Sequence, residues 1–334
     1  MPEIRTGYDG KLFTRHSLWF FMNLFEYTYD LVRQIPPGKV STYGAVAEAL
    51  GDPIAARSVG RMMNQNPDPD TMPCYKIVHS DGRLGGFGGG ISDKIRRLRN
   101  DGIHVHNGKL VDFEDRLYDD FETTYPLRTL RAEQISLSKK VRLVDESQEI
   151  DTIAGIDVAY PDSEFEDACG ACAIFDYRTK QLIDTHLVYA KTDFPFISTY
   201  FSYRELPIVE RLMNHVTVKP SVLLLDGNGI LHPYRCGFAS HAGLRFCIPT
   251  IGVAKTLLYG TVKEELVTIN DEPRGYALSL KGTKPVFVSP GHRMSLPRSR
   301  TIVQTISHLK NPEPLRVAHR CAKEGLLEHR ELVA

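Results

Sequence analysis

The sequence has no excess of charge of either sign. Its 334 residues include 41 Lys and Arg against 41 Asp and Glu, which leaves a formal net charge of zero. Non-specific binding to nucleic acid rests on positive charge, so this composition argues against a protein that coats DNA by charge alone. The composition is compatible with a nucleic-acid enzyme, because a local basic patch supplies affinity for nucleic acid whatever the total charge is.

Long apolar runs and dense cysteines are also missing. A transmembrane helix needs about 20 apolar residues. The apolar run Leu18–Phe25 is far shorter and contains Asn23, and the polar N-terminus does not resemble a secretion signal. Six cysteines are too sparse for a secreted disulfide framework. We therefore expect a cytoplasmic protein with no membrane partner.

The remaining composition is that of a globular protein, with 42% hydrophobic and 25% charged residues. A chain of this length favours about two domains. The segment Arg116–Tyr125 is acidic and aromatic without periodicity, and a new helical pattern follows it. We predict a first domain over residues 1–118, a linker over 119–126 and a second domain over 127–334.

The first half predicts mainly helices. An amphipathic pattern covers Leu18–Ile35, and two short helices follow over Tyr43–Leu50 and Ile54–Asn64. Between them Gly51 breaks the first helix, and Asp52 is placed to cap the second, with Pro53 at its first position. Two short helices around a tight turn are typical of a DNA-binding helix-turn-helix, although helical hairpins are also common in structural roles.

A run of cations follows a glycine-rich loop. Residues Lys94–Arg99 place four cations in six positions on a predicted helix. Two interpretations stay open, a solvated helix face and a strip that contacts phosphates.

Cys74 lies between this helix-turn-helix and the glycine-rich loop, in a segment, Cys74–Val78, that predicts a strand. A lone intracellular cysteine is more often inert packing than a nucleophile. Several ordered motifs around Cys74 change this expectation. They are Val40-Ser41-Thr42-Tyr43-Gly44, Ala55-Ala56-Arg57-Ser58-Val59-Gly60, Asn66-Pro67, Pro73-Cys74-Tyr75-Lys76-Ile77 and Arg99-Asn100-Asp101-Gly102.

With these motifs, the region from about Phe20 to Leu110 resembles the active-site domain of the O6-alkylguanine-DNA alkyltransferases. The resemblance implies a winged-helix-like domain that enters the minor groove. Cys74 then takes the alkyl group of a flipped guanine in one irreversible step. Arg57 fills the space of the extruded base, Tyr43 helps rotate the nucleotide phosphate, and Asn66 belongs to a hinge.

The sequence departs from this family at the groups that activate the thiol. Tyr75 stands where the family has histidine, and Asp101 stands where it has glutamate. Tyrosine is a poor base at neutral pH, because its reference pKa is about 10. We expect Lys76 or a helix end to activate Cys74. The alternative is a sensor that binds the lesion without transfer, as in the related alkyltransferase-like proteins, which lack the cysteine.

The second half alternates strands and helices and predicts an α/β domain with a mixed sheet. Two acids interrupt or end apolar, strand-like runs, Asp157 within Ile153–Tyr160 and Asp226 after Val222. A buried charge needs a partner or a metal. Glu205 ends a Ser-x-x-Glu pattern, which by itself predicts a capping box. Together the three carboxylates predict a divalent metal site, since hard oxygen ligands suit Mg²⁺ or Mn²⁺.

From about Leu127 to Gly325 the chain resembles endonuclease V, which has a ribonuclease-H-like fold. The motifs that carry the resemblance are Gly155-Ile156-Asp157-Val158, Tyr203-Arg204-Glu205, Asp226-Gly227-Asn228-Gly229-Ile230, His232-Pro233, Ala239-Ser240-His241, Gly252-Val253-Ala254-Lys255 and Gly291-His292-Arg293.

This second resemblance implies metal-assisted hydrolysis of a phosphodiester 3′ to a deaminated base. Hypoxanthine is the chief candidate base, with uracil and xanthine as further ones. Backbone groups of the loops Gly227–Gly229 and Gly237–His241 read the flipped base. The residues implied are Asp157, Glu205 and Asp226 as ligands of Mg²⁺, for which Mn²⁺ can substitute, His292 to position water or a second metal, and His232 and Lys255 on the phosphates.

The family also inserts a Pro-Tyr-Ile-Pro wedge between the strands. Here the matching residues are Pro195-Phe196-Ile197-Ser198, so Phe196 is available to stack on bases while the second proline is lost. Cys169-Gly170-Ala171-Cys172 forms a C-x-x-C pattern, for which we expect core packing rather than a redox or zinc role.

Taken together, these patterns predict a monomeric, bifunctional DNA repair protein whose partners are DNA with alkylated guanine and DNA with deaminated bases. Inosine in RNA is the alternative substrate of the nuclease half.

Overall fold

The computed structural model describes residues 22–146, 149–162, 167–280, 284–308 and 311–333. Within these ranges the chain forms two compact units. The N-terminal unit comprises residues 22–132 together with Asp193–Ser198, and the C-terminal unit comprises residues 133–192 and 199–333. The predicted linker and a short segment from the predicted second domain thus group with the N-terminal unit.

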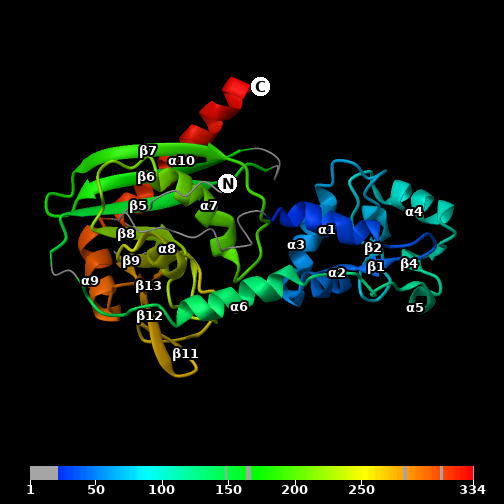
Figure 1. Ribbon diagram of the computed structural model, residues 1–334, viewed down its shortest axis with the longest axis horizontal. Coiled ribbons are helices and arrows are strands. Elements are labelled where there is room, and N and C mark those ends of the chain that lie inside the picture. Colours follow the sequence, from blue (N-terminus) through cyan, green and yellow to red (C-terminus); the bar gives the residue numbers. More distant parts are fainter. Residues whose placement is uncertain (1–21, 147–148, 163–166, 281–283, 309–310, 334) are drawn as a thin grey trace, which may run out of the picture. The chain divides into compact units, whose positions relative to one another are not determined.

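Helices dominate the N-terminal unit (Figure 1). The predicted helix over Leu18–Ile35 is present as α1, which begins at Leu24 with Asn23 as its N-cap and ends at Arg33; the predicted residues 18–21 lie outside the described part. The short strands pair as β1 with β2, in parallel, and β3 with β4, antiparallel. The elements are α1 Leu24–Arg33, β1 Ser41–Thr42, α2 Tyr43–Leu50, η2 Pro53–Ala55, α3 Ala56–Asn64, η3 Cys74–Lys76, β2 Ile77–Val78, α4 Ile91–Asn100, β3 Val105–His106, β4 Lys109–Leu110 and α5 Phe113–Arg116.

Local signals set the helix-turn-helix formed by α2 and α3. The Thr42 hydroxyl accepts the Ala45 N–H at 3.0 Å and caps α2. Gly51 ends the helix with φ of +106°, a left-handed conformation that favours glycine. Asp52 then accepts the Ile54 N–H at 3.1 Å, with Pro53 as the first residue of η2. These observations confirm the predicted helix pair and its turn.

The C-terminal unit is built on one mixed sheet, as predicted. The strand order in the described residues is β10-β11-β12-β13-β9-β8-β5-β6-β7. β5, β8 and β9 run parallel to one another, while β5, β6 and β7 form an antiparallel meander. This central order is the expected ribonuclease-H-like arrangement. The strands are β5 Thr152–Ala159, β6 Ala168–Asp176, β7 Leu182–Ala190, β8 Val222–Asp226, β9 Thr250–Ala254, β10 Thr261–Lys263, β11 Leu266–Ile269, β12 Glu272–Leu278 and β13 Val286–His292.

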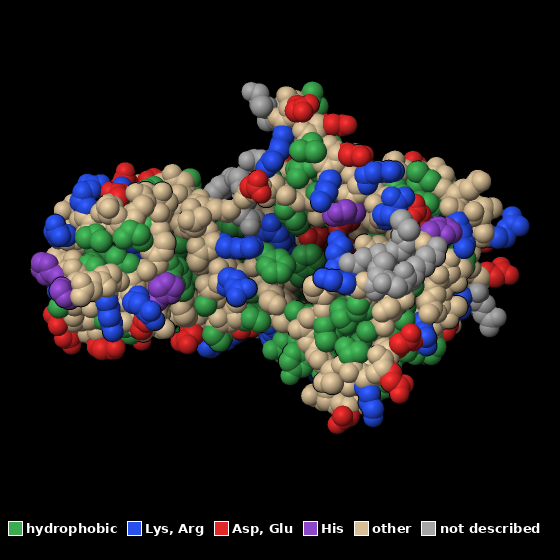
Figure 2. Space-filling view, turned by 180° about the vertical axis from the view of Figure 1, so that it is seen from behind, with side chains coloured by type: hydrophobic (Ala, Val, Ile, Leu, Met, Phe, Trp, Pro, Cys, Tyr) green, Lys and Arg blue, Asp and Glu red, His purple; other side chains and the backbone are tan. Residues whose placement is uncertain are grey.

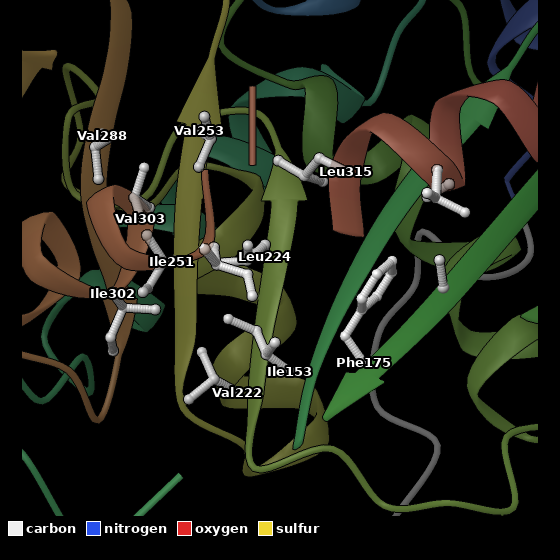
Figure 3. Packing of buried hydrophobic residues seen from close by; sticks show 14 of the residues in the cluster. Ile153, Phe175, Val222, Leu224, Ile251, Val253, Val288, Ile302, Val303 and Leu315 are labelled. Carbon is white, nitrogen blue, oxygen red and sulfur yellow. The ribbon is translucent and has the colours of Figure 1, made fainter. Parts of the chain in front are cut away.

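Helices cover both faces of this sheet. α9 (Leu296–Ile306) and α10 (Glu313–Val333) close the main apolar core, in which Ile153, Leu224 and Ile251 point toward Ile302 and Leu315 (Figure 3). α7 (Phe201–Met213) and α8 (Phe238–Phe246) pack on the opposite face. The chain between the units forms α6 (Pro126–Ser138). The sequence analysis did not predict α8 or α10.

α10 begins directly against β5. A Cβ atom on Gly155 would lie 2.2 Å from the carbonyl carbon of Pro314, so only glycine allows this approach. The close packing places the second turn of α10, which carries His319, beside the end of β5.

The surface charge is mixed. Figure 2 shows Lys and Arg side chains interspersed with Asp and Glu on the face in view, in keeping with the zero net charge. In the described part of the chain, no helix is long and apolar enough to cross a membrane.

Candidate active sites

Asp157 and Asp226 lie side by side at the carboxyl ends of two parallel strands. β5 and β8 pair with Ile156 opposite Leu225, so the next residue on each strand is one of the two acids. Lys255 follows β9, the next parallel strand, and forms an ion pair with Asp226. The carboxyl end of parallel strands is where α/β proteins commonly bind ligands. The topology thus brings together three residues that the sequence predicted as one site.

Glu205 reaches the same site from α7. Its side chain is buried, with 3% of the residue exposed. Burial, together with the charges of Asp157 and Asp226, raises the pKa of Glu205 well above its usual range, while Tyr160 and Arg204 oppose the shift. The alternative interpretation of Glu205 as part of a capping box is wrong. The N-cap of α7 is Tyr200, which makes no capping hydrogen bond.

Asp157 has a partner that the sequence analysis did not name. The Nδ1 atom of His319, on α10, lies 2.6 Å from Oδ2 of Asp157. Burial and the neighbouring Asp226 raise the pKa of Asp157, and His319 and Lys255 act against this rise. The centre therefore concentrates negative charge, beside which Lys255 and His319 each contact a carboxylate.

Cys74 occupies a tight turn rather than the predicted strand. Residues Cys74–Lys76 form the 3₁₀ turn η3, and only Ile77–Val78 pair as a strand. The thiol is buried, with 4% of the residue exposed. Asn66 Nδ2 donates hydrogen bonds to Cys74 Sγ at 3.0 Å and to the Met72 carbonyl at 2.8 Å. Asn66, the predicted hinge residue, thus contacts the Cys74 thiol directly.

Burial raises the pKa of the Cys74 thiol. The hydrogen bond from Asn66 and the positive charges of Lys94 and Arg97 lower it in part. A buried thiol is inert unless such groups stabilise its thiolate form. The site therefore depends on its cationic neighbours.

The residues predicted to contact DNA, Tyr43, Arg57 and Phe196, lie on different segments of the N-terminal unit. Tyr43 opens α2, and its hydroxyl lies so close to Gly85 that a Cβ there would be 2.1 Å away. Arg57 is exposed on α3. The Ser58 hydroxyl, also on α3, donates to the carbonyl oxygen of Phe196, whose side chain is 45% exposed. The predicted wedge and the recognition helix are therefore in contact within one unit.

Comparisons with known proteins assign a family to each half of the chain. The family model "Endonuclease V" matches residues 135–320, and "6-O-methylguanine DNA methyltransferase, DNA binding domain" matches residues 23–103. A bifunctional methyltransferase/endonuclease from Picrophilus torridus is 39% identical over 298 residues, 89% of this chain and 95% of the relative. Its counterpart from Thermoplasma volcanium is 38% identical over 305 residues, 90% of each chain. This chain belongs to the bifunctional methyltransferase/endonuclease family.

A solved structure is similar to the endonuclease part. It is endonuclease V from Ciona intestinalis in complex with a DNA that contains an inosine followed by a ribo-adenosine. The match has a TM-score of 0.57 and 28% sequence identity, and covers 62% of this chain and 99% of that one.

Two histidines of the endonuclease half have structural contacts. His292 Nδ1 accepts the Arg142 N–H at 3.2 Å, and burial lowers the pKa of His292 to about 4. The charged groups that act on it are Arg293, Glu146 and Arg142, and none is a predicted metal ligand. The structure therefore brings His319, and not His292, to the carboxylates.

His232, which the resemblance implies as a phosphate contact, lies in the loop after β8. Its Nε2 donates to the Thr199 carbonyl at 3.1 Å, and its Nδ1 accepts the Tyr234 N–H at 3.2 Å. Both ring nitrogens are thus engaged in hydrogen bonds with backbone groups.

The two loops predicted to read the base are joined by their backbones. The Gly237 N–H donates to the Gly229 carbonyl, and the Ala239 N–H to the Asn228 carbonyl, each at 3.0 Å. A Cβ on Gly229 would lie 2.0 Å from the Pro290 carbonyl oxygen. Glycine at this position is therefore required for this loop to pack against β13.

The acidic centre fits a divalent cation by its donor set. Enzymes of the endonuclease V family are typically metal-dependent. Among the described residues, no group of three or more His, Cys, Asp or Glu side chains is already arranged as a metal cage. Asp157, Glu205 and Asp226 nevertheless offer hard oxygen atoms, and the burial and mutual repulsion that raise the pKa of Asp157 and Glu205 are relieved by a bound cation.

Tyr75 and Asp101, which stand where the methyltransferase family has histidine and glutamate, form a network of their own. Tyr75 donates to Asp101 at 3.1 Å, and burial raises the pKa of Tyr75 to about 12, so it stays protonated. Lys76 Nζ contacts the carbonyls of Ile35 and Pro36 and the Asp101 carboxylate. Lys76, expected to activate Cys74, is thus engaged elsewhere.

The C-x-x-C pattern lies in β6. Burial raises the pKa of Cys169 to about 11 and that of Cys172 to about 12, so both stay thiols within the sheet. These observations favour the predicted role in core packing.

Proposed function

We propose that this protein acts on two kinds of damaged base in DNA. The C-terminal unit nicks a strand 3′ to a deaminated base, chiefly hypoxanthine, with Mg²⁺ as the cofactor. The N-terminal unit transfers the alkyl group of O6-alkylguanine irreversibly to Cys74. The family supports the dual repair activity, and the residues described above support the two chemistries.

For the nuclease, Asp157, Glu205 and Asp226 would hold the metal. A bound divalent ion polarises the phosphate and stabilises the leaving oxygen. Lys255 adds positive charge beside Asp226, where charge develops on the phosphate. Asp157 holds His319 through Nδ1, so Nε2 is the nitrogen that can exchange a proton with water or the leaving oxygen.

For the methyltransferase, Cys74 is held by Asn66 beside the recognition helix-turn-helix. The sulfur forms a bond to the alkyl carbon of the flipped base, and the bond from this carbon to O6 breaks. Tyr43 and Arg57 would support the flipped nucleotide and the gap it leaves.

One observation carries the proposal. The side-by-side placement of Asp157 and Asp226, with buried Glu205, occurs in a chain whose relatives across nearly its whole length combine the two enzymes. The test uses the full chain with two duplexes, one with hypoxanthine and one with O6-methylguanine. The Cys74→Ser variant should keep nicking and lose methylation of the Cys74 peptide, and Asp226→Asn should do the reverse.

Two results would change the proposal. If wild-type protein binds O6-methylguanine DNA tightly and no methyl group reaches Cys74, the N-terminal unit is a lesion sensor. If an RNA strand with inosine is cut faster than the matching DNA strand, the nuclease substrate is RNA. The second candidate is worth testing because the Ciona intestinalis relative was solved with a ribonucleotide next to its inosine.

A further inference from the structure

A short segment of the endonuclease half belongs to the helix-turn-helix unit. Residues Asp193–Ser198 lie between β7 and α7 in the sequence, yet they group with the N-terminal unit. The Leu24 N–H donates to the Asp193 carbonyl oxygen at 2.8 Å, and Asn23 Nδ2 donates to the Asp193 carboxylate at 3.2 Å. These two hydrogen bonds tie the start of the segment to the N-terminus of α1.

The recognition helix holds the middle of this segment. The Ser58 hydroxyl of α3 donates to the carbonyl oxygen of Phe196, and Ser58 itself is buried. Phe194 and Ile197 are buried as well, with 6% and 1% of each residue exposed, whereas Phe196 is 45% exposed. The segment is therefore anchored on both sides of a ring that stays partly in water.

Cations lie on the exposed side of the same helix. α3 turns its apolar residues inward and leaves Arg57 and Arg61 exposed. These two arginines are four positions apart, so they lie on one face of the helix. A single exposed apolar side chain is common and means little by itself. An exposed ring held by a helix that also presents two arginines is different, because proteins bind the bases and phosphates of nucleic acid with aromatic rings and cations together.

The cations of α4 offer no comparable surface. Lys94 is fully buried, and its Nζ donates to two backbone carbonyl oxygens. Arg96 is exposed but forms an ion pair with Asp93, as does Arg97. Three of the four cations in the predicted basic strip are thus engaged within the unit. These contacts favour α3, and not α4, as the cationic face of the N-terminal unit.

We propose that Asp193–Ser198 forms part of the DNA-binding face of the N-terminal unit, and that Phe196 stacks on a base of the duplex that α3 binds. A nucleotide that is flipped out leaves its neighbours and its pairing partner without a contact, and an aromatic ring takes such a place at little sequence cost. Arg61 adds positive charge for the phosphates beside Arg57. A segment of the endonuclease half thereby serves the methyltransferase half. This inference rests on the proposed binding of alkylated DNA.

The test measures DNA binding by the full chain in the absence of chemistry. A fluorescent duplex with one O6-methylguanine is titrated in EDTA, and Cys74→Ser is the parent protein, so that no alkyl group is transferred. In this parent, Phe196→Ala should raise the Kd by about tenfold, the loss expected when one base loses an aromatic stacking partner. Phe196→Trp keeps an aromatic face and should bind at least as tightly as the parent. The matched control is Leu182→Ala, which removes another half-exposed apolar side chain, from the C-terminal unit, and should leave the Kd unchanged.

A double-mutant cycle tests the contact between α3 and the segment. Ser58→Ala removes the hydrogen bond to Phe196 and should raise the Kd by about threefold, as expected for the loss of one hydrogen bond. In the Phe196→Ala protein the same change should add nothing, because Ser58 acts through the position of the ring. Equal effects of Ser58→Ala in both proteins would overturn this positioning role.

Two binding results would overturn the interface itself. In the first, Phe196→Ala binds the alkylated duplex like the parent. In the second, Phe196→Trp binds it as weakly as Phe196→Ala. Nicking of a hypoxanthine duplex in Mg²⁺ identifies the rival role, because a ring that serves the nuclease alone would slow nicking in Phe196→Ala while the binding of alkylated DNA stays unchanged.

A separate measurement distinguishes this inference from the proposed function. Methylation of Cys74 by O6-methylguanine DNA is followed in the protein with its native thiol. Binding that depends on Phe196, with no methyl group on Cys74, would overturn alkyl transfer and leave the interface standing. Methyl transfer together with binding that Phe196→Ala does not alter would overturn the interface alone.

Discussion

The two candidate sites differ in the charge that they bury: one gathers carboxylates, and the other buries a thiol and a lysine. The acidic centre gathers Asp157, Glu205 and Asp226; burial and this proximity raise the pKa of Asp157 and Glu205, while Lys255 pairs with Asp226 and His319 with Asp157. The thiol site instead favours neutral groups, because burial raises the pKa of Cys74 and lowers that of Lys94. The first arrangement suits the capture of a cation. The second holds a thiol whose ionised form depends on the hydrogen bond from Asn66 and on nearby positive charges.

The largest expected effect concerns the acidic centre. Asp157→Asn or Asp226→Asn should slow single-turnover nicking of a hypoxanthine duplex in Mg²⁺ by about a thousandfold or more, because metal-assisted charge stabilisation provides several kcal/mol. Binding of the duplex should change little. The matched control is Asp271→Asn, at an exposed turn where asparagine tolerates the observed positive φ. Near-normal nicking by both ligand variants would refute the ligand assignment.

The next effect distinguishes the two histidines. His319→Ala should lower the nicking rate by about a hundredfold, the usual loss when an acid–base group is removed. His292→Ala should keep the rate and lose stability by about 1 kcal/mol, since it removes the acceptor of the partly buried hydrogen bond from the Arg142 N–H. Nicking rates and urea unfolding of the two variants check this. The reverse pattern would restore the original assignment of His292.

A smaller effect, on the reactivity of Cys74, is expected when residue 75 is changed to the histidine that the methyltransferase family has at this position. Tyr75→His replaces a hydroxyl with a pKa of about 12 by an imidazole that can accept a proton near pH 7. We expect Cys74 to react with iodoacetamide about ten times faster at pH 7. Tyr75→Phe is the control and should not accelerate the reaction. If both variants react at the wild-type rate, residue 75 has no part in activating the thiol.

The smallest effect concerns acid stability of the C-terminal unit. Burial lowers the pKa of His241 to about 4, below the ordinary value of about 6.5. Between these values the unfolded chain binds more protons, so His241 contributes stability above about pH 6.5 that is lost as the pH falls toward 4. Burial of Asp157 and Glu205 acts with the opposite sign, because raised carboxyl pKa values favour the folded state in acid.

The difference between variants isolates the histidine. In His241→Gln, the loss of unfolding free energy between pH 7 and pH 5 should be smaller than in wild type by about 1 to 2 kcal/mol. The exposed His215, replaced in the same way, should give the wild-type slope. An unchanged slope in His241→Gln would show that this histidine is charged in the folded protein.

Much of the fold followed from local patterns. Thr42, Gly51 and Asp52 are capping and turn residues whose effect stays within a few positions, and the structure has the helix and the turn at the predicted places. The apolar runs before Asp157 and Asp226 became adjacent strands. The missed α10 has a signal in the same terms, because Leu315, Ala318, Ala322 and Leu326 recur at helical spacing and are buried.

The chemistry of individual side chains was less predictable. Lys94 looks like its exposed neighbour Arg96 in the sequence, and His292 stands in a family motif while His319 does not. What separates them is burial and the neighbours that distant segments supply. Asp157 and His319 are 162 positions apart and meet only because the start of α10 packs on Gly155.

The sequence by itself therefore determined the two families, the helix-turn-helix, the mixed sheet and the carboxylates, because these depend on residue type and short-range order. The tertiary structure decided which side chain holds Cys74 and which histidine contacts Asp157. The physical reason is that protonation and ion pairing depend on desolvation and on charges a few ångströms away, and packing between remote segments sets both.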